Sequence, residues 1–179
     1  SCTHNKEYFI ERALACIEHQ SFVNWECIII DDGSTDLSGK IVQQYISTRG
    51  QRWKYVYQEN MGQAAARNSG INQSTGKYLA FLDADDISSQ DRLQQQSDFL
   101  TNNLNILAVG SECSRCDEDK GSPTHILSCF VGFRPQVPLF ERARHRRRDE
   151  HIGSLVVRAM PAALVPTGRN LTLVDAEML

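Results

Sequence analysis

The feature that most constrains the fold is a regular alternation of short apolar runs with segments of helical periodicity. Four runs have the length and composition of buried β-strands, and these are Cys27–Ile30, Trp53–Tyr57, Lys77–Leu82 and Ile106–Val109. Four segments have helical spacing, and these are Asn5–Gln20, a segment with Asp36 as its N-cap, Ala64–Ile71 and Gln90–Leu100. Alternation with short loops predicts an α/β fold with a mainly parallel sheet flanked by helices.

Two of the predicted strands end abruptly in carboxylates. Asp31 and Asp32 follow the first run, and the sequence DADD at 83–86 follows the third. Ligands of parallel sheets bind at the carboxyl ends of the strands, so neighbouring strands would bring Asp31, Asp32, Asp83 and Asp85 to one crevice. Carboxylates gathered there repel one another unless a cation lies between them, and Mg²⁺ or Mn²⁺ prefers such oxygen ligands. The alternative is that both clusters are ordinary turn and N-cap residues. Their joint position at strand ends favours a ligand site.

Composition excludes several classes of protein. The 179 residues suffice for one domain, and a net charge of −3 gives no basic field for nucleic acid. No apolar run approaches the ~20 residues of a membrane span. Charged residues near the N-terminus argue against a signal peptide, and scattered cysteines favour reduced thiols. We therefore expect a cytoplasmic protein.

Composition changes near Gly121, because lysine stops at Lys120 and arginine replaces it. The first 120 residues have the pattern of a regular domain core, and residues 121–179 are less regular. The arginine-rich run at 141–151 is interleaved with acids and predicts a solvated face, with anionic lipid or a lipid-linked acceptor as the alternative partner. Cys113 and Cys116 form one CxxC without the second pair that a zinc site needs.

Three ordered motifs resemble the family 2 glycosyltransferases, which have the GT-A fold. The motifs are CIIIDDGSTD at 27–36, ENMGQAAARNSGI at 59–71 and GKYLAFLDADD at 76–86. The resemblance covers residues 3 to about 110. Thr3–Asn5 is similar to the end of the first-strand motif of that family, and the strand before it is expected to be missing. The resemblance implies a nucleotide-sugar-binding core at 1–120 and an incomplete acceptor-side part of the same domain at 121–179.

The resemblance also implies roles for individual residues. Thr3 would contact the nucleotide from the loop after the missing strand, and Asp32 would accept a hydrogen bond from the base. Arg67 would lie near the nucleotide and diphosphate. Asp83 would approach the ribose or the sugar, and Asp85 would hold Mg²⁺ or Mn²⁺ against the diphosphate. Asp31 is expected to shape the turn.

The acceptor side depends on VDAEML at 174–179. Its alignment on the family's acceptor motif, where a Glu-Asp pair is usual, places Asp175 as the catalytic base and Val174 where glutamate is expected. Glu177 is the second candidate for the base. The alternative for Asp175 is a helix N-cap.

The implied reaction moves a sugar from a UDP or GDP donor to a hydroxyl of a saccharide or lipid-linked acceptor, with inversion, as in polysaccharide biosynthesis. Two alternatives stay open. One is a non-catalytic relative that only binds the nucleotide sugar, and the other is a nucleotidyltransferase. The latter would need a glycine-rich phosphate loop and a lysine after its first strand, which the start of this chain cannot show.

Overall fold

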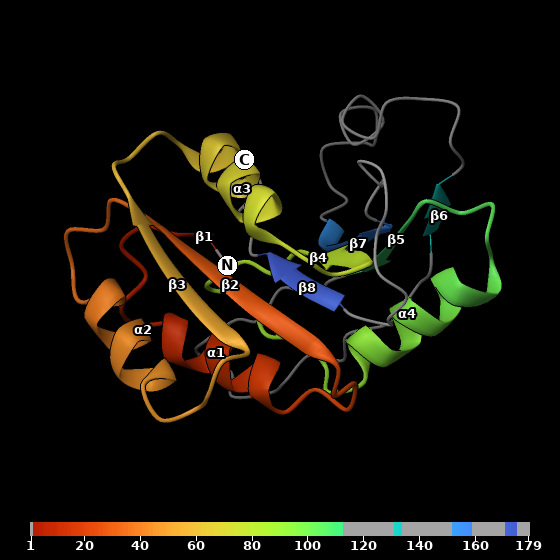
Figure 1. Ribbon diagram of the computed structural model, residues 1–179, viewed down its shortest axis with the longest axis horizontal. Coiled ribbons are helices and arrows are strands. Elements are labelled where there is room, and N and C mark those ends of the chain that lie inside the picture. The colour runs from red at the N-terminus through yellow and green to blue at the C-terminus, as the bar shows by residue number, and fades with distance from the viewer. Residues whose placement is uncertain (1, 113–130, 134–151, 159–170, 175–179) are drawn as a thin grey trace.

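The computed structural model describes residues 2–112, 131–133, 152–158 and 171–174 (Figure 1). Its strands are β1 (Cys2–Thr3), β2 (Trp25–Asp32), β3 (Trp53–Gln58), β4 (Tyr78–Ala80), β5 (Ala108–Glu112), β6 (Val131–Phe133), β7 (Ile152–Arg158) and β8 (Leu171–Val174). Its helices are α1 (Ile10–Glu18), α2 (Ser38–Ile46), α3 (Gln63–Gln73) and α4 (Arg92–Asn102). The predicted α/β fold is confirmed.

All the described strands join one sheet, which has a parallel half and an antiparallel half. The path through the sheet is β1-β2-β8-β4-β7-β5-β6, with β3 on the other side of β2. Strands β1, β3 and β8 pair with β2 in parallel, and β4 pairs with β8 in parallel. Strand β7 is antiparallel to β4 and β5, and β6 is antiparallel to β5. The parallel half therefore carries the strand ends that the sequence singled out.

Strands β1 and β8 share one side of β2, end to end. Strand β8 pairs with Trp25–Ile28, whereas β1 pairs with Ile30 and Asp31, and β3 holds the opposite side. The loop that follows β1 therefore leaves the sheet at its carboxyl edge, on the side of β2 that faces β4.

Helices cover both faces of this half of the sheet, which explains why the central residues of β2, Cys27 to Ile30, are all apolar. Cys27 and Ile29 pack with α1, α2 and α4 in the larger core cluster. Ile28 and Ile30 pack on the other face against Ala66 of α3. Figure 1 shows α3 on one side of β2 and β3, with α1 and α2 on the other. Successive side chains of a strand point to opposite faces, so the alternation continues into the two aspartates at its end.

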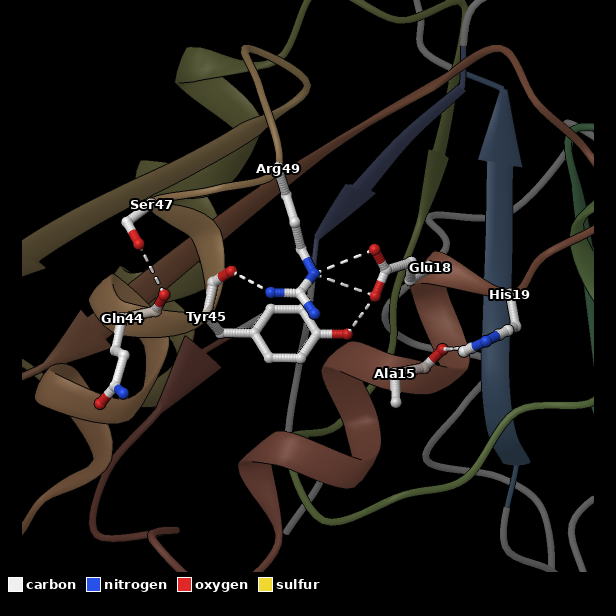
Figure 2. Close-up of polar contacts among 7 residues, drawn as sticks. All are labelled: Ala15, Glu18, His19, Gln44, Tyr45, Ser47 and Arg49. Carbon is white, nitrogen blue, oxygen red and sulfur yellow. Dashed lines mark hydrogen bonds and ion pairs between the residues drawn. The ribbon is translucent and has the colours of Figure 1, made fainter.

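A polar cluster joins α1 to α2 at the surface (Figure 2). The Tyr45 hydroxyl donates to Glu18 Oε2 at 2.5 Å, and Arg49 Nε donates to both Glu18 oxygens at 2.9 and 3.0 Å. The guanidinium carbon of Arg49 lies 3.6 Å from the centroid of the Tyr45 ring. The hydrogen bond from Tyr45 is the main cause that lowers the pKa of Glu18. This cluster ties together two helices that pack on the Cys27 and Ile29 face of β2.

Several boundaries differ from those expected. Cys2–Thr3 pair as a strand, so the expectation of a wholly missing first strand is corrected, and Thr3 lies in that strand and not in the loop after it. The first helix begins at Ile10, because residues before it form turns that start with Asn5 at φ 55°. Asp36 is not the N-cap of α2, which is Leu37, although its carboxylate accepts the Ser38 amide at 2.9 Å.

The later strands also differ in extent. The third predicted run forms only the short strand β4, and β5 begins two residues after Ile106. Strands β6, β7 and β8 lie within residues 121–179, the part of the chain that has the less regular sequence pattern. Within the described residues, no helix is both long enough and apolar enough to span a membrane.

Candidate functional site

The adjacent aspartates at the end of β2 point to opposite faces of the sheet. Asp31 continues the face that α1 and α2 cover, and Asp32 continues the face that α3 covers. Both are buried, with 1% and 4% of their surface exposed. Two charged groups that are buried side by side need separate sets of donors. The structure supplies two such sets.

Asp31 is held by groups from the turn and from β3. Its Oδ2 accepts from the Tyr55 hydroxyl at 2.6 Å, and its Oδ1 accepts from the Ser34 amide at 2.9 Å. Burial and the bond to Asp31 raise the pKa of Tyr55. A Cβ on Gly39 would meet the Tyr55 hydroxyl at 2.6 Å and Asp31 Oδ2 at 2.7 Å, so only glycine fits there. The expectation that Asp31 shapes the turn agrees with this geometry.

Asp32 receives its hydrogen bonds from the segment between β3 and α3. Its Oδ1 accepts from Gln58 Nε2 at 2.6 Å and from the Met61 amide at 3.0 Å. Neither bond uses Oδ2. Met61 itself is exposed, and it precedes the N-terminal end of α3. Asp32 is therefore fixed by one oxygen at a place that borders the surface.

The turn after β2 lies against the loop after β3. Gly33 has φ +75°, and a Cβ there would lie 2.8 Å from the Asn60 amide nitrogen. This close approach needs glycine for both its conformation and its size. The two loops therefore form one rigid wall beside Asp32.

The start of the chain packs against this wall. Thr3 is 1% exposed, and its Oγ1 has no hydrogen-bond partner among the described residues. His4 Nδ1 lies 3.1 Å from the Asp32 carbonyl oxygen. Asn5 Oδ1 accepts from the Thr35 amide at 2.9 Å. A buried hydroxyl without a partner is unfavourable. The expected contact between Thr3 and a nucleotide stays a prediction.

The acidic end of β4 is more open than that of β2. Asp83 is partly buried, and its carbonyl oxygen accepts from the Asp86 amide at 3.0 Å in a turn. Asp85 is exposed, and its Oδ2 lies 2.9 Å from Lys6 Nζ in the loop after β1. This contact joins residues that are 79 positions apart. It shows that the loops after β1 and β4 meet at the carboxyl edge of the sheet.

The sequence predicted that the two acidic strand ends meet in one crevice if their strands are neighbours. This prediction is met only in part. Strands β2 and β4 are not neighbours, because β8 lies between them and pairs with both. One intervening strand separates the two acidic ends by about 10 Å at the usual strand spacing. Asp31 also turns toward Tyr55 and away from a shared crevice. Of the four expected carboxylates, Asp32, Asp83 and Asp85 are thus the ones available to a ligand that spans the edge.

Two buried polar residues hold the acidic segment after β4 in place through hydrogen bonds. They were not identified from the sequence. Arg92 Nε donates to Ser88 Oγ at 2.8 Å, and its Nη1 donates to the Phe81 carbonyl at 3.2 Å. Burial lowers the pKa of Arg92 to about 10. Gln20 Nε2 donates to the Ser89 carbonyl at 2.7 Å, while its Oε1 accepts the Leu93 amide at 3.1 Å. Arg92 begins α4 and Gln20 follows α1, and a polar residue at the end of a helix is not a sequence pattern that indicates such a role.

Two of the expected site residues are placed less fully. Arg67 is half-buried in α3, next to Ala66, which packs beneath Ile28 and Ile30. Its role toward a diphosphate stays a prediction. Asp175, the expected base, lies outside the described residues, directly after the last residue of β8. Cys113, Cys116 and the arginine-rich run at 141–151 also lie outside them.

The carboxylates after β4 suit a divalent cation that takes most of its ligands from substrate phosphates and water. Within the described ranges, no group of three His, Cys, Asp or Glu side chains is arranged to bind a metal. Asp85 nevertheless holds the positive charge of Lys6 at 2.9 Å, and its side chain is 37% exposed. Mg²⁺ commonly takes one or two carboxylates together with substrate phosphates and water. Asp85, with Asp83 beside it, suits that arrangement.

The fold and the site define an α/β protein that presents acidic and hydrogen-bonding groups at the carboxyl edge of a parallel sheet. The model of the family "Glycosyl transferase family 2" matches residues 1–165. The chain therefore belongs to family 2 of the glycosyltransferases, as the three sequence motifs predicted.

Named relatives and solved structures agree with that family. The chain is 35% identical to glycosyltransferase GlyA of Streptococcus pneumoniae, over 77% of this chain and 20% of GlyA. It is 40% identical to the putative teichuronic acid biosynthesis glycosyltransferase TuaG of Bacillus subtilis, over 55% of this chain and 39% of TuaG. S. aureus TarS 1-349 in complex with UDP shares the fold, with a TM-score of 0.55 at 24% identity over 69% of this chain and 36% of TarS 1-349. The chain thus spans less than half the length of each of these proteins.

Proposed function

We propose that this chain binds a nucleotide-diphosphate sugar at the carboxyl edge of its parallel sheet and transfers the sugar to an acceptor hydroxyl. The observation that carries the proposal is the meeting of three loops, those after β1, β2 and β4, around Asp32 and Asp85. The separation of about 10 Å between the two acidic strand ends suits a ligand with a base at one end and a diphosphate at the other. The complexes of TarS with UDP and with UDP-GlcNAc make UDP the first nucleotide to test.

The nucleotide would occupy the side of β2. Asp32 keeps one oxygen outside its internal hydrogen bonds, and a carboxylate oxygen can accept an N–H from a uracil or guanine edge. Thr3 lies on the neighbouring strand in register with Asp31, so its unsatisfied hydroxyl is on the face opposite to Asp32 and is not assigned to this contact. Arg67 would add positive charge toward the diphosphate.

The diphosphate and the sugar would occupy the side of β4. A bound Mg²⁺ or Mn²⁺ supplies charge neutralisation of the leaving diphosphate, and Asp85 would hold it. Asp83 would orient the ribose or the sugar. Arg92 and Gln20 keep this segment in place, because their side chains bond to its backbone and to Ser88.

Asp175 would take the proton of the acceptor hydroxyl while the hydroxyl oxygen attacks the anomeric carbon of the donor sugar. One displacement without an enzyme nucleophile inverts the anomeric configuration. The acceptor would be a saccharide or a lipid-linked saccharide.

Calorimetric titration of UDP and of GDP, each with Mn²⁺ and with EDTA, tests the donor site. The wild-type chain should bind one of the two nucleotides in the presence of Mn²⁺. Asp85→Ala should lose at least about tenfold in that affinity, because a charged contact contributes about 1.5–3 kcal/mol. Asp98→Ala, on the exposed side of α4, is the matched control and should bind as the wild type does. Absence of binding by the folded wild-type chain would overturn the proposal.

A test of turnover separates the transferase from a relative that only binds. The residues proposed to bind the donor lie in the described part of the chain, whereas the proposed base Asp175 lies outside it. Binding of the nucleotide alone therefore does not imply transfer of the sugar. Slow hydrolysis or transfer from the matching nucleotide sugar that is lost in Asp175→Asn would support the transferase. Tight, metal-dependent binding without any turnover would support the non-catalytic alternative.

A further inference from the structure

The side chain of Lys6 has no assigned part in the donor site described above, although its ion pair with Asp85 crosses that site. Lys6 Nζ lies 2.9 Å from Asp85 Oδ2, and the two side chains are 22% and 37% exposed. The pair joins the loop after β1 to the loop after β4, across the edge where the donor is placed. A lysine ammonium thus neutralises the carboxylate that is assigned to the metal.

The backbone of Lys6 is fixed independently of its side chain. Its amide donates to Ser38 Oγ at 2.8 Å, and its carbonyl accepts from the Phe9 and Ile10 amides at 2.9 and 3.0 Å. The loop is also held by the Asn5 amide, which donates to Ser34 Oγ at 3.1 Å. A substitution at Lys6 leaves these bonds in place, and the flexible side chain can move without the loop.

The position of the loop puts Lys6 between the two ends of the proposed ligand. Strand β1 pairs with β2 on the side that faces β4, so its loop emerges between Asp32 and Asp85. A nucleotide diphosphate that extends from Asp32 to Asp85 would pass beside Lys6. The ammonium and a divalent cation cannot both occupy the same oxygen of Asp85.

We propose that Lys6 is a donor-binding residue that exchanges its partner, pairing with Asp85 when the site is empty and with the diphosphate when the donor and the cation are bound. This inference rests on the proposed function. In the empty site, Lys6 competes with the cation for Asp85. In the occupied site, the released ammonium donates to a phosphate oxygen and offsets charge that the cation leaves uncompensated.

Two titrations on Lys6→Gln test the exchange, because they are expected to change in opposite directions. For Mn²⁺ alone, the variant should bind about two- to fivefold more tightly than wild type, since an exposed ion pair no longer competes. For the nucleotide at saturating Mn²⁺, it should bind about tenfold more weakly, since a charged hydrogen bond to phosphate is lost. Lys54→Gln, at an exposed position of β3, should change neither affinity.

Further variants keep the result decisive. Lys6→Met, which keeps the length of the side chain, should reproduce both shifts if Lys6→Gln folds poorly. Lys6→Arg should retain nucleotide binding to within about threefold, because the positive charge remains. A purely structural role would weaken both affinities together, and that outcome would overturn the inference, as would no change in either. Failure of the wild type to bind any nucleotide would instead overturn the proposed function beneath it.

Discussion

The two acidic strand ends have the same appearance in sequence and opposite environments in the structure. At β2, Asp31 and Asp32 are nearly completely buried, and their carboxylates accept hydrogen bonds from side chains and backbone amides. At β4, Asp85 is exposed and has one lysine as its partner. The first pair is thus largely part of the fold, whereas the second is open to solvent and to ligands.

The difference comes from the packing around each strand end. Strand β2 lies between helices on both faces, so its last residues remain inside the core and their charges must be compensated there. Strand β4 is short, and the segment after it first reaches the surface at Asp85, directly after the buried Ala84. The carboxylates at the covered end of β2 therefore accept hydrogen bonds within the fold, whereas Asp85, at the open end of β4, is exposed to solvent.

Asp31→Ala gives the largest expected effect and tests the structural half of this comparison. The change removes the acceptor of the Tyr55 hydroxyl and the Ser34 amide, so the free energy of unfolding should fall by about 2–4 kcal/mol. Urea denaturation followed by circular dichroism measures it. A loss below about 1 kcal/mol would show that Asp31 is no more structural than Asp85.

High pH should lower the free energy of unfolding, because the buried Cys27 thiol resists ionisation in the folded state. Burial raises the pKa of the Cys27 thiol from 9.0 to about 11. The folded state therefore opposes ionisation, and its stability is complete below pH 9 and is lost as the pH rises toward 11. This difference between the two pKa values corresponds to a loss of roughly 2–3 kcal/mol in the free energy of unfolding at pH 11.

The unfolding free energy measured between pH 8 and 11 checks this effect. The slope should be smaller in Cys27→Ala than in wild type, while Tyr45 and Tyr55, whose pKa values are also raised, contribute equally to both proteins. Equal slopes in the two proteins would contradict the prediction.

Gly39→Ala should destabilise the same region by about 1–3 kcal/mol, because its methyl group would overlap the Tyr55 hydroxyl and Asp31 Oδ2. Thermal unfolding compared with wild type measures the loss. Lys40→Ala, at the exposed neighbouring position of α2, is the control and should change stability by less than about 0.5 kcal/mol. A smaller loss for Gly39→Ala in the Asp31→Ala background would locate the overlap at the carboxylate.

Asp85→Ala should have the smallest effect on stability. An exposed ion pair contributes about 0–1 kcal/mol, so the unfolding free energy should stay within that range of wild type. The same urea denaturation used for Asp31→Ala measures it. A loss comparable to that of Asp31→Ala would remove the contrast between the two strand ends, and its proposed loss of nucleotide binding would then have to be attributed to unfolding.

The sequence determined the class of fold, the strands and helices of residues 10–112, and the family. It did so because strand and helix periodicity, strand-end carboxylates and glycine-containing turns are local patterns. It also predicted a site at Asp32 and Asp85, because their motifs are contiguous, and that site stays a prediction. Boundaries such as the start of α1 at Ile10 differed because turns after β1 depend on contacts with residues near Ser34.

Only the tertiary structure decided which of the carboxylates are structural and which are accessible. Their partners come from distant parts of the chain, with Tyr55 24 residues from Asp31, and Lys6 79 residues from Asp85. The placement of β8 between β2 and β4 likewise depends on strand pairing across more than 90 residues, as the Leu171–Tyr78 register shows. Local sequence contains no record of such pairings, because burial and long-range hydrogen bonds depend on how the whole chain packs.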